Sequence, residues 1–156
     1  MRERRLQRTS RCTWVSICAI LSLTLLFSTS AFAQTKRLVL VTGNQSTIPE
    51  LTLNQVRRIY LGHALRGTAI TPLSNQSDDL LFEVFLQKVI FLSERDYEKR
   101  LITRTFQTGD RRPSVHLKER DLLQSLERQT GSVTFMWEET ASRHPQLRVV
   151  KVLWSE

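Results

Sequence analysis

The sequence predicts an α/β domain with a mainly parallel β-sheet flanked by helices. Strand-like runs are separated by helical patterns along the chain, and connections through helices favour parallel strands that are covered on both faces. The first such run, "RLVLVT" at residues 37–42, is almost continuously Val and Leu, which is typical of a strand buried on both faces. The part of the chain after residue 33 is long enough for one domain with its own hydrophobic core.

Residues 1–33 have the features of a secretory signal peptide. A basic head with five Arg and one Glu is followed by the apolar run "TWVSICAILSLTLLF" and then by "STSAFA" just before Gln34. The apolar run is shorter than the roughly 20 residues that a membrane-spanning helix needs. We therefore predict cleavage after Ala33 and an exported domain, residues 34–156, that is periplasmic or secreted.

The composition of the predicted domain excludes several classes of function. Both cysteines, Cys12 and Cys18, lie in the predicted signal peptide, so the domain has no disulfide, thiol nucleophile or thiolate metal ligand. Half of the net charge of +8 also belongs to residues 1–33, and the remaining charges are interspersed. A mild basic excess suits a protein that meets anions. No aromatic-and-basic recognition motif is present, and we expect no nucleic-acid partner.

A helix and a second strand are predicted after the first strand. "TLNQ", which begins at Thr52, is a capping box and predicts a helix to about Leu61, ended by Gly62. "AITPL" at residues 69–73 predicts the second strand. In this helix we expect an inward apolar face formed by Val56, Ile59 and Tyr60. We expect Arg57 and Arg58 at its exposed edge.

The rest of the chain predicts three helices followed by two strands. Ser77 is expected to cap a heavily buried helix with a wide apolar face. "SERD" at Ser93 starts the next helix, "QTGDRRPS" breaks it, and a further helix ends at Gly131. "SVTFMW" and "LRVVKVLW" are the last strands, around a short polar segment. The side chains expected to point inward from the three helices are Leu81, Phe82, Phe85, Leu86, Val89 and Ile90; Tyr97, Leu101 and Ile102; Leu122, Leu123 and Leu126.

Three stretches resemble a known family. "LTLNQVRRIYLGHALR", after a strand and a short loop, is similar to a segment of the periplasmic phosphate-binding proteins, the solute receptors of phosphate ABC transporters. "LLQSLERQTGSVTFMWEE" resembles their later helix, glycine and strand, and "FQTGDRRPS" is similar to a loop of short receptor-like proteins. The resemblance extends from about Leu38 to Glu139 and implies the type 2 periplasmic-binding-protein fold. The receptors bind phosphate between two lobes, and a chain of this size supplies about one lobe.

The resemblance also implies a ligand site and shows where this chain departs from it. In the family, "R-x-D-G-S-G-T" precedes a helix whose N-terminus binds phosphate, whereas this chain has "PLSNQSDD" at residues 72–79. Ser77 can replace the family's serine, and Asn75 and Gln76 precede it, but the arginine and the glycines are missing. Asp78 and Asp79 suit a helix N-terminus, and each would repel a phosphate there by an amount on the order of 3–4 kcal/mol.

The basic loop "TGDRRP" is the other candidate for an anion site. Thr108, Gly109, Arg111 and Arg112 could hold a phosphate or a carboxylate, since arginine binds both in a bidentate manner. The alternative is a solvated basic loop that Asp110 partly neutralises. Ser77, in the same way, is either a ligand contact or only a helix cap.

No motif of enzyme chemistry is present, and we expect no catalysis, no metal and no cofactor. The chain lacks a nucleophile elbow, a phosphate-binding Walker loop and a zinc-protease motif. Its histidines lie in separate segments without metal-ligand spacing, and we expect them at the surface: His63, His116 and His144. Trp137 and Trp154 are expected to pack at strand ends.

Two functions remain open from the sequence. The first is an exported, non-catalytic solute-binding protein for phosphate or another small anion. The second is an accessory or sensory interaction module of a membrane transporter or sensor complex that has lost phosphate binding.

Overall fold

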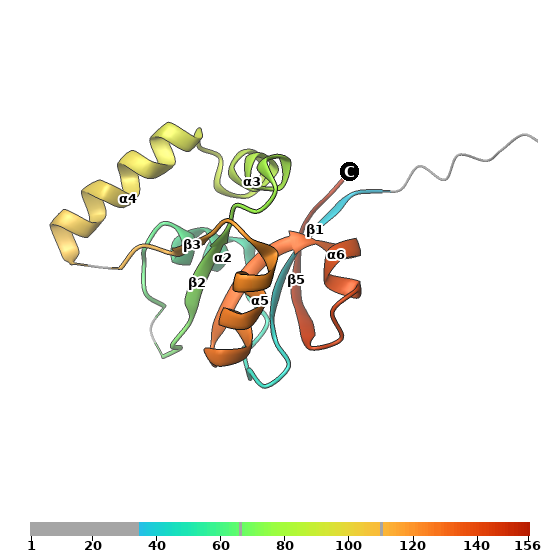
Figure 1. Cartoon of the computed structure of the whole chain (residues 1–156). Helices are drawn as coiled ribbons and strands as arrows, with labels where there is room; N and C mark the ends of the chain where they lie inside the picture. Colours follow the sequence, from blue (N-terminus) through green and yellow to red (C-terminus); the bar gives the residue numbers. More distant parts are fainter. Residues whose placement is uncertain (1–34, 66, 110) are drawn as a thin grey trace, which may run out of the picture. The chain divides into compact units, whose positions relative to one another are not determined.

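The computed structural model describes residues 35–65, 67–109 and 111–156, and the predicted signal peptide lies outside the described residues. The described residues form one domain with a five-stranded sheet and helices on its faces (Figure 1). Its elements are β1 (Arg37–Gly43), α2 (Leu53–Tyr60), β2 (Thr71–Asn75), α3 (Asp79–Phe85), the π-helical turn η2 (Leu86–Ile90), α4 (Glu94–Thr108), β3 (Ser114–His116), α5 (Glu119–Arg128), β4 (Ser132–Trp137), α6 (Glu138–Ser142) and β5 (Leu147–Ser155). None of the helices in this part of the chain has the length and hydrophobicity needed to cross a membrane.

The strand order is β3-β2-β4-β1-β5. β2 is parallel to both β3 and β4, and β1 is antiparallel to both β4 and β5. Consequently β2, β3, β4 and β5 run in one direction and β1 runs against them. The predicted α/β class with a helix-flanked sheet is confirmed, and the carboxyl ends of β2, β3 and β4 lie at one edge of the sheet. We call this the strand-end edge.

The larger hydrophobic core lies between the sheet and the helices α2, α3, η2 and α4. Its centre is an aromatic group in which the rings of Phe85 and Phe135 stack with centroids 3.7 Å apart. The ring of Tyr60 meets both edge-on, at 4.8 Å and 5.6 Å. A smaller core on the other face lies under α5 and α6 and consists of Val39, Val41, Leu73, Leu122, Leu126, Met136 and Ala141.

Several local predictions are confirmed. The capping box of α2 is formed, since the Thr52 N–H donates to Gln55 Oε1 (2.8 Å) and the Gln55 N–H donates to Thr52 Oγ1 (3.3 Å). Ser93 caps α4, and Gly109 ends it in the left-handed conformation. The side chains expected inward from the helix after residue 77 are all buried. Trp137 and Trp154 are partly buried and pack against the larger core.

Other local predictions are wrong. Ile102 is 39% exposed, because the buried side of α4 is limited to Tyr97 and Leu101. Arg57 is half-buried rather than at an exposed edge: its Nε donates to the Val89 carbonyl, and its guanidinium lies 4.3 Å from the centre of the Phe91 ring. The arginine therefore ties the end of the π-helical turn to α2.

Three elements also differ in extent or presence. The second strand begins two residues later than expected, at Thr71. The three-residue strand β3 and the short helix α6 were not predicted.

The three histidines are half-buried rather than fully at the surface.

Two tyrosines deep in the larger core have buried hydroxyl groups. The Tyr60 hydroxyl lies within hydrogen-bond distance of the carbonyls of Leu73 (3.1 Å) and Val133 (3.3 Å), and the Tyr97 hydroxyl donates to the Tyr60 carbonyl (2.9 Å). Burial raises the pKa of both phenols well above the ordinary value of about 10.

These raised pKa values predict a loss of stability in alkali. The unfolded chain loses the two phenolic protons near pH 10, whereas the folded chain keeps them, so the contribution is fully present below that pH and is lost as the pH rises toward the folded pKa. Above about pH 10 the free energy of unfolding should fall by about 1.4 kcal/mol per pH unit for each tyrosine. Urea denaturation along a pH series measures this slope. Tyr97→Phe should remove about half of it, and an unchanged slope in that variant would contradict the assignment.

Candidate functional site

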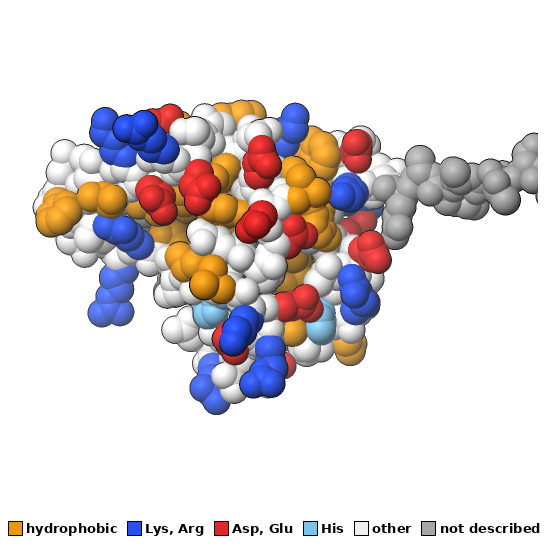
Figure 2. All heavy atoms as spheres, turned by 45° about the horizontal axis from the view of Figure 1, so that its top comes forward, with side chains coloured by type: hydrophobic (Ala, Val, Ile, Leu, Met, Phe, Trp, Pro, Cys, Tyr) orange, Lys and Arg blue, Asp and Glu red, His pale blue; other side chains and the backbone are white. Residues whose placement is uncertain are grey.

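A pocket of about 260 Å³ lies at the strand-end edge. The end of β2, the end of β4 and the first turns of α3, α5 and α6 surround it, as expected for ligand sites of α/β sheets. Figure 2 turns this edge toward the reader and shows Asp and Glu side chains interspersed with hydrophobic ones, with most Lys and Arg side chains at the margins. The lining residues are Asn75, Ser77, Asp78, Leu81, Leu117, Lys118, Glu119, Met136, Trp137 and Thr140.

The N-terminus of α3 is closed by a carboxylate of the chain itself. Asp78 Oδ1 accepts the N–H of Leu81 (3.1 Å), and Asp78 Oδ2 accepts the indole N–H of Trp137 (3.0 Å). The prediction that Ser77 caps this helix is therefore wrong. Both oxygens of Asp78 are engaged, so this carboxylate occupies the place where an anion would meet the helix.

Ser77 is held by the neighbouring Asn75. The N–H and the hydroxyl of Ser77 both donate to Asn75 Oδ1, at 3.1 Å and 2.7 Å, which is the short side-chain turn that Asn favours. This turn explains why the helix starts one residue later than predicted. Asn75 is only 3% exposed, and its Nδ2 donates to the Phe135 carbonyl (3.1 Å), so it joins the ends of β2 and β4.

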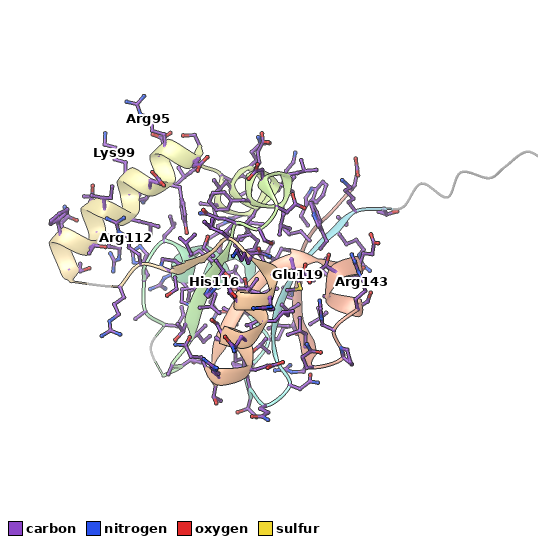
Figure 3. The ribbon with its side chains drawn as sticks, in the orientation of Figure 1. Arg95, Lys99, Arg112, His116, Glu119 and Arg143 are labelled. Atoms are coloured by element: carbon purple, nitrogen blue, oxygen red, sulfur yellow. The ribbon has the colours of Figure 1, made fainter. Side chains whose placement is uncertain are left out.

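The N-terminus of α5 has a different chemistry. Its cap residue, Lys118, makes no side-chain capping bond, and Glu119 and Asp121 lie in the first turn. Glu119 Oε1 is 2.7 Å from His144 Nε2, which brings the segment after α6 to the start of α5 (Figure 3). The pocket thus combines one ammonium group, two carboxylates and the hydroxyls of Ser77 and Thr140. Such groups can bind and orient a polar partner.

The structure separates the predicted site residues into two places. Asn75 and Ser77 line the pocket, but Gln76 does not: its N–H donates to the His116 carbonyl (2.9 Å) and joins β2 to β3. The candidates in the basic loop lie at the far end of α4 and beyond it, and Figure 3 shows Arg112 well to one side of Glu119. These loop candidates are Thr108, Gly109, Arg111 and Arg112.

The loop candidates themselves are in simple local environments. The Thr108 hydroxyl donates to the Arg104 carbonyl (3.0 Å) within α4, and Gly109 has a φ of 71°. Arg111 and Arg112 are exposed, and Asp110, which lies between Gly109 and Arg111, is outside the described residues. In the described part of the chain no three His, Cys, Asp or Glu side chains are grouped as metal ligands.

The capping role of Asp78 gives a testable prediction. Asp78→Ala should lower the free energy of unfolding by about 1–2 kcal/mol, because the helix loses its cap and the Trp137 N–H loses its acceptor. The matched control is Asp79→Ala, which removes a neighbouring charge that contributes only through the helix dipole and should cost less than about 1 kcal/mol. Urea denaturation of both variants measures the difference, and equal losses would show that the two bonds of Asp78 contribute nothing.

The sequence matches no family model and no curated protein. Solved structures do match. An ABC-type phosphate transport receptor from Vibrio cholerae superposes with a TM-score of 0.55 at 12% identity, covering 75% of this chain and 46% of the receptor. PstS from Borrelia burgdorferi gives a TM-score of 0.55 at 12% identity, with 75% and 47% covered. A possible phosphate binding protein from Planctomyces limnophilus DSM 3776 gives 0.52 at 15%, with 75% and 41% covered.

At these identities the similarity establishes the fold. The chain spans less than half the length of the receptors it matches, which corresponds to about one lobe. The described domain, with its mixed sheet and helices on both faces, therefore has the fold of about one lobe of the phosphate ABC transporter substrate-binding proteins.

Proposed function

We propose that this protein is an exported, non-catalytic binding module that docks a protein partner, a component of a membrane transporter or sensor complex, through its strand-end edge. Export to the periplasm, or secretion, follows from the predicted signal peptide at residues 1–33. The observation that carries the docking proposal is the engagement of Asp78. A receptor-type phosphate site needs donors at the start of α3, and here a carboxylate takes the Leu81 and Trp137 N–H groups.

The strand-end edge has the character of a docking surface. Leu117 is 70% exposed and Leu80 is 47% exposed, and both lie where the first turns of α5 and α3 begin. Acidic side chains lie in the first turns of α3, α5 and α6, and Figure 2 shows carboxylates interspersed with hydrophobic side chains on this face. A partner segment with apolar anchors between Lys or Arg side chains would complement this surface, since charge complementarity directs association and buried apolar anchors supply affinity.

Site-specific photocrosslinking tests the docking proposal. A photoreactive amino acid at position 117, in cells that express the protein from its full gene, should give a discrete protein adduct. The matched control position is Arg128, which is exposed at the opposite end of α5 and should give none. Charge reversal by Asp79→Lys with Glu139→Lys should abolish the adduct. The proposal fails if neither position 117 nor a second photoreactive residue placed at Leu80 gives an adduct, or if the adduct survives charge reversal.

A second candidate function is binding of phosphate or another small anion in the strand-end pocket. It is favoured by the start of α5, where Lys118 lines the pocket and no side chain caps the helix. Backbone N–H groups and an ammonium group are donors that an anion can use. Ser77 lines the same pocket, and its hydroxyl would have to leave Asn75 Oδ1 before it could donate to the anion.

Calorimetric and thermal titration with inorganic phosphate tests the second candidate. Phosphate at a hundred times its Kd should stabilise the fold by about 2.7 kcal/mol. Lys118→Gln should abolish the shift if the pocket is the site. If the anion is instead bound by the basic loop, where Thr108 and Gly109 would also contact it, the double variant Arg111→Ala with Arg112→Ala should abolish the shift. Absence of any shift removes this candidate and leaves the docking proposal untouched.

A further inference from the structure

A second cavity, of about 410 Å³, lies on α4 and shares no lining residue with the strand-end pocket. One wall is α4, and the other includes His63, in the segment that follows α2. We call this cavity the α4 groove. Its lining residues are His63, Asp96, Lys99, Arg100, Thr103, Arg104 and Gln107.

The spacing of the lining residues places three cations on adjoining rows of one helix. Arg100 and Arg104 are four residues apart and lie on one row, and Lys99 begins the neighbouring row. At 1.5 Å of rise per residue, the two arginines are separated by about 6 Å along the helix axis. One ligand with two anionic groups can therefore meet both ends of this basic row.

Arg104 is fixed in position by the opposite wall of the groove. Its Nε donates to the Gly62 carbonyl at 2.8 Å. Gly62 has a φ of 80°, and a Cβ added there would lie 3.3 Å from Arg104 Cδ, so the absence of a side chain allows this close approach. A guanidinium held by the backbone loses less conformational entropy when it binds a ligand.

The other charged groups of the groove leave it basic. The single carboxylate of the lining, Asp96, accepts the hydroxyl of Ser93 at 2.7 Å, at the start of the helix. Lys99 and Arg100 are exposed, and neither side chain makes a hydrogen bond or an ion pair with another residue among those that the structure describes. Figure 3 shows Lys99 projecting from α4 next to Arg95, which lies one turn earlier and does not line the groove.

We propose that the α4 groove binds a small polyanion with at least two anionic groups, such as a polycarboxylate or a diphosphate. Arg100 and Arg104 bind the two groups, Lys99 adds a third positive charge, and Thr103 and Gln107 supply polar contacts at the rim. The groove volume and the separation of the two arginines favour such a ligand over a single inorganic phosphate. This site is independent of the strand-end pocket and of the docking proposal.

Calorimetry of the purified protein, produced from its full gene, tests the proposal with citrate and pyrophosphate as probes and inorganic phosphate as the comparator. Both polyanions should bind, and more tightly than phosphate. Lys99→Gln and Arg100→Gln should each weaken their binding by about tenfold or more, because each removes a charge-assisted contact. Both positions are exposed, so the variants should keep the circular dichroism spectrum of the parent.

Two matched controls make the test specific. Arg95→Gln removes the same charge from the same helix outside the groove, and Lys118→Gln removes a charge from the strand-end pocket. Each should change the affinity by less than about twofold, since only screened long-range charge is lost. The proposal is overturned if neither polyanion binds, if Arg95→Gln weakens binding as much as Arg100→Gln, or if Lys118→Gln alone abolishes it.

Discussion

Replacing Phe135 with Ala should lower the free energy of unfolding by about 3–5 kcal/mol, the largest loss expected for a single side chain in this domain. Phe135 is fully buried in β4, and its ring stacks on Phe85 and meets the edge of Tyr60. Truncation removes these contacts and leaves a cavity between β4 and α3 that the surrounding side chains fill only in part. Urea denaturation followed by circular dichroism measures the change.

A matched control for this variant lies on α4. Phe106 is 85% exposed, so Phe106→Ala removes the same ring from a site that packs against little and should change the free energy of unfolding by less than about 0.5 kcal/mol. Similar losses in the two variants would contradict the central place of the aromatic group. Because Asn75 donates to the Phe135 carbonyl, loss of packing at Phe135 should also loosen the strand-end pocket.

Elements with strong local signals were predictable from the sequence. α2 carries a capping box in consecutive residues, and the buried helix after residue 77 has apolar side chains on several adjoining rows. β1 is a continuous apolar run that lies between two other strands and is covered on both faces. In each case the residues that determine the element lie within the element itself.

Elements that depend on tertiary partners were not predictable. β3 is three residues long, and its strand conformation depends on pairing with β2. α6 has five polar and small residues and a single buried side chain, Ala141, so it has no apolar periodicity to detect. The reversed direction of β1 also depends on the sheet order, which no local pattern contains.

The candidate site was predictable only in part, for the same reason. Asp78 and Asp79 could be assigned to a helix N-terminus from their place before an apolar run, and Asp78 is the cap. Lys118 and Glu119 are far from them in the sequence, and they reach the same pocket only because β2 lies between β3 and β4. The α4 groove likewise depends on the packing of Gly62 against Arg104, which the sequence does not show.

Replacing Gly131 with Ala should lower the free energy of unfolding by more than about 2 kcal/mol, because two costs combine at this position. Gly131 has a φ of 87°, a conformation that costs a residue with a side chain roughly 1–2 kcal/mol. A Cβ there would also lie 2.6 Å from the carbonyl oxygen of Ala69, so the backbone before β2 must move. That movement would disturb the bonds from Thr71 N–H to the Gly131 carbonyl and from Gly131 N–H to Ser46 Oγ.

Gly109 separates the two costs, since its φ is 71° and a Cβ there would meet no atom within 4 Å. Gly109→Ala should therefore cost only the roughly 1–2 kcal/mol of the left-handed conformation. Urea denaturation gives the free energy of unfolding of both variants. The difference between their losses measures the free-energy cost of crowding where the chain before β4 approaches the chain before β2. This approach sets the register of the β2–β4 pair, whose opposite end forms the strand-end pocket. Equal losses would show that the backbone at Ala69 yields freely, and the pocket would then lack the rigid strand pair on which a docking surface depends.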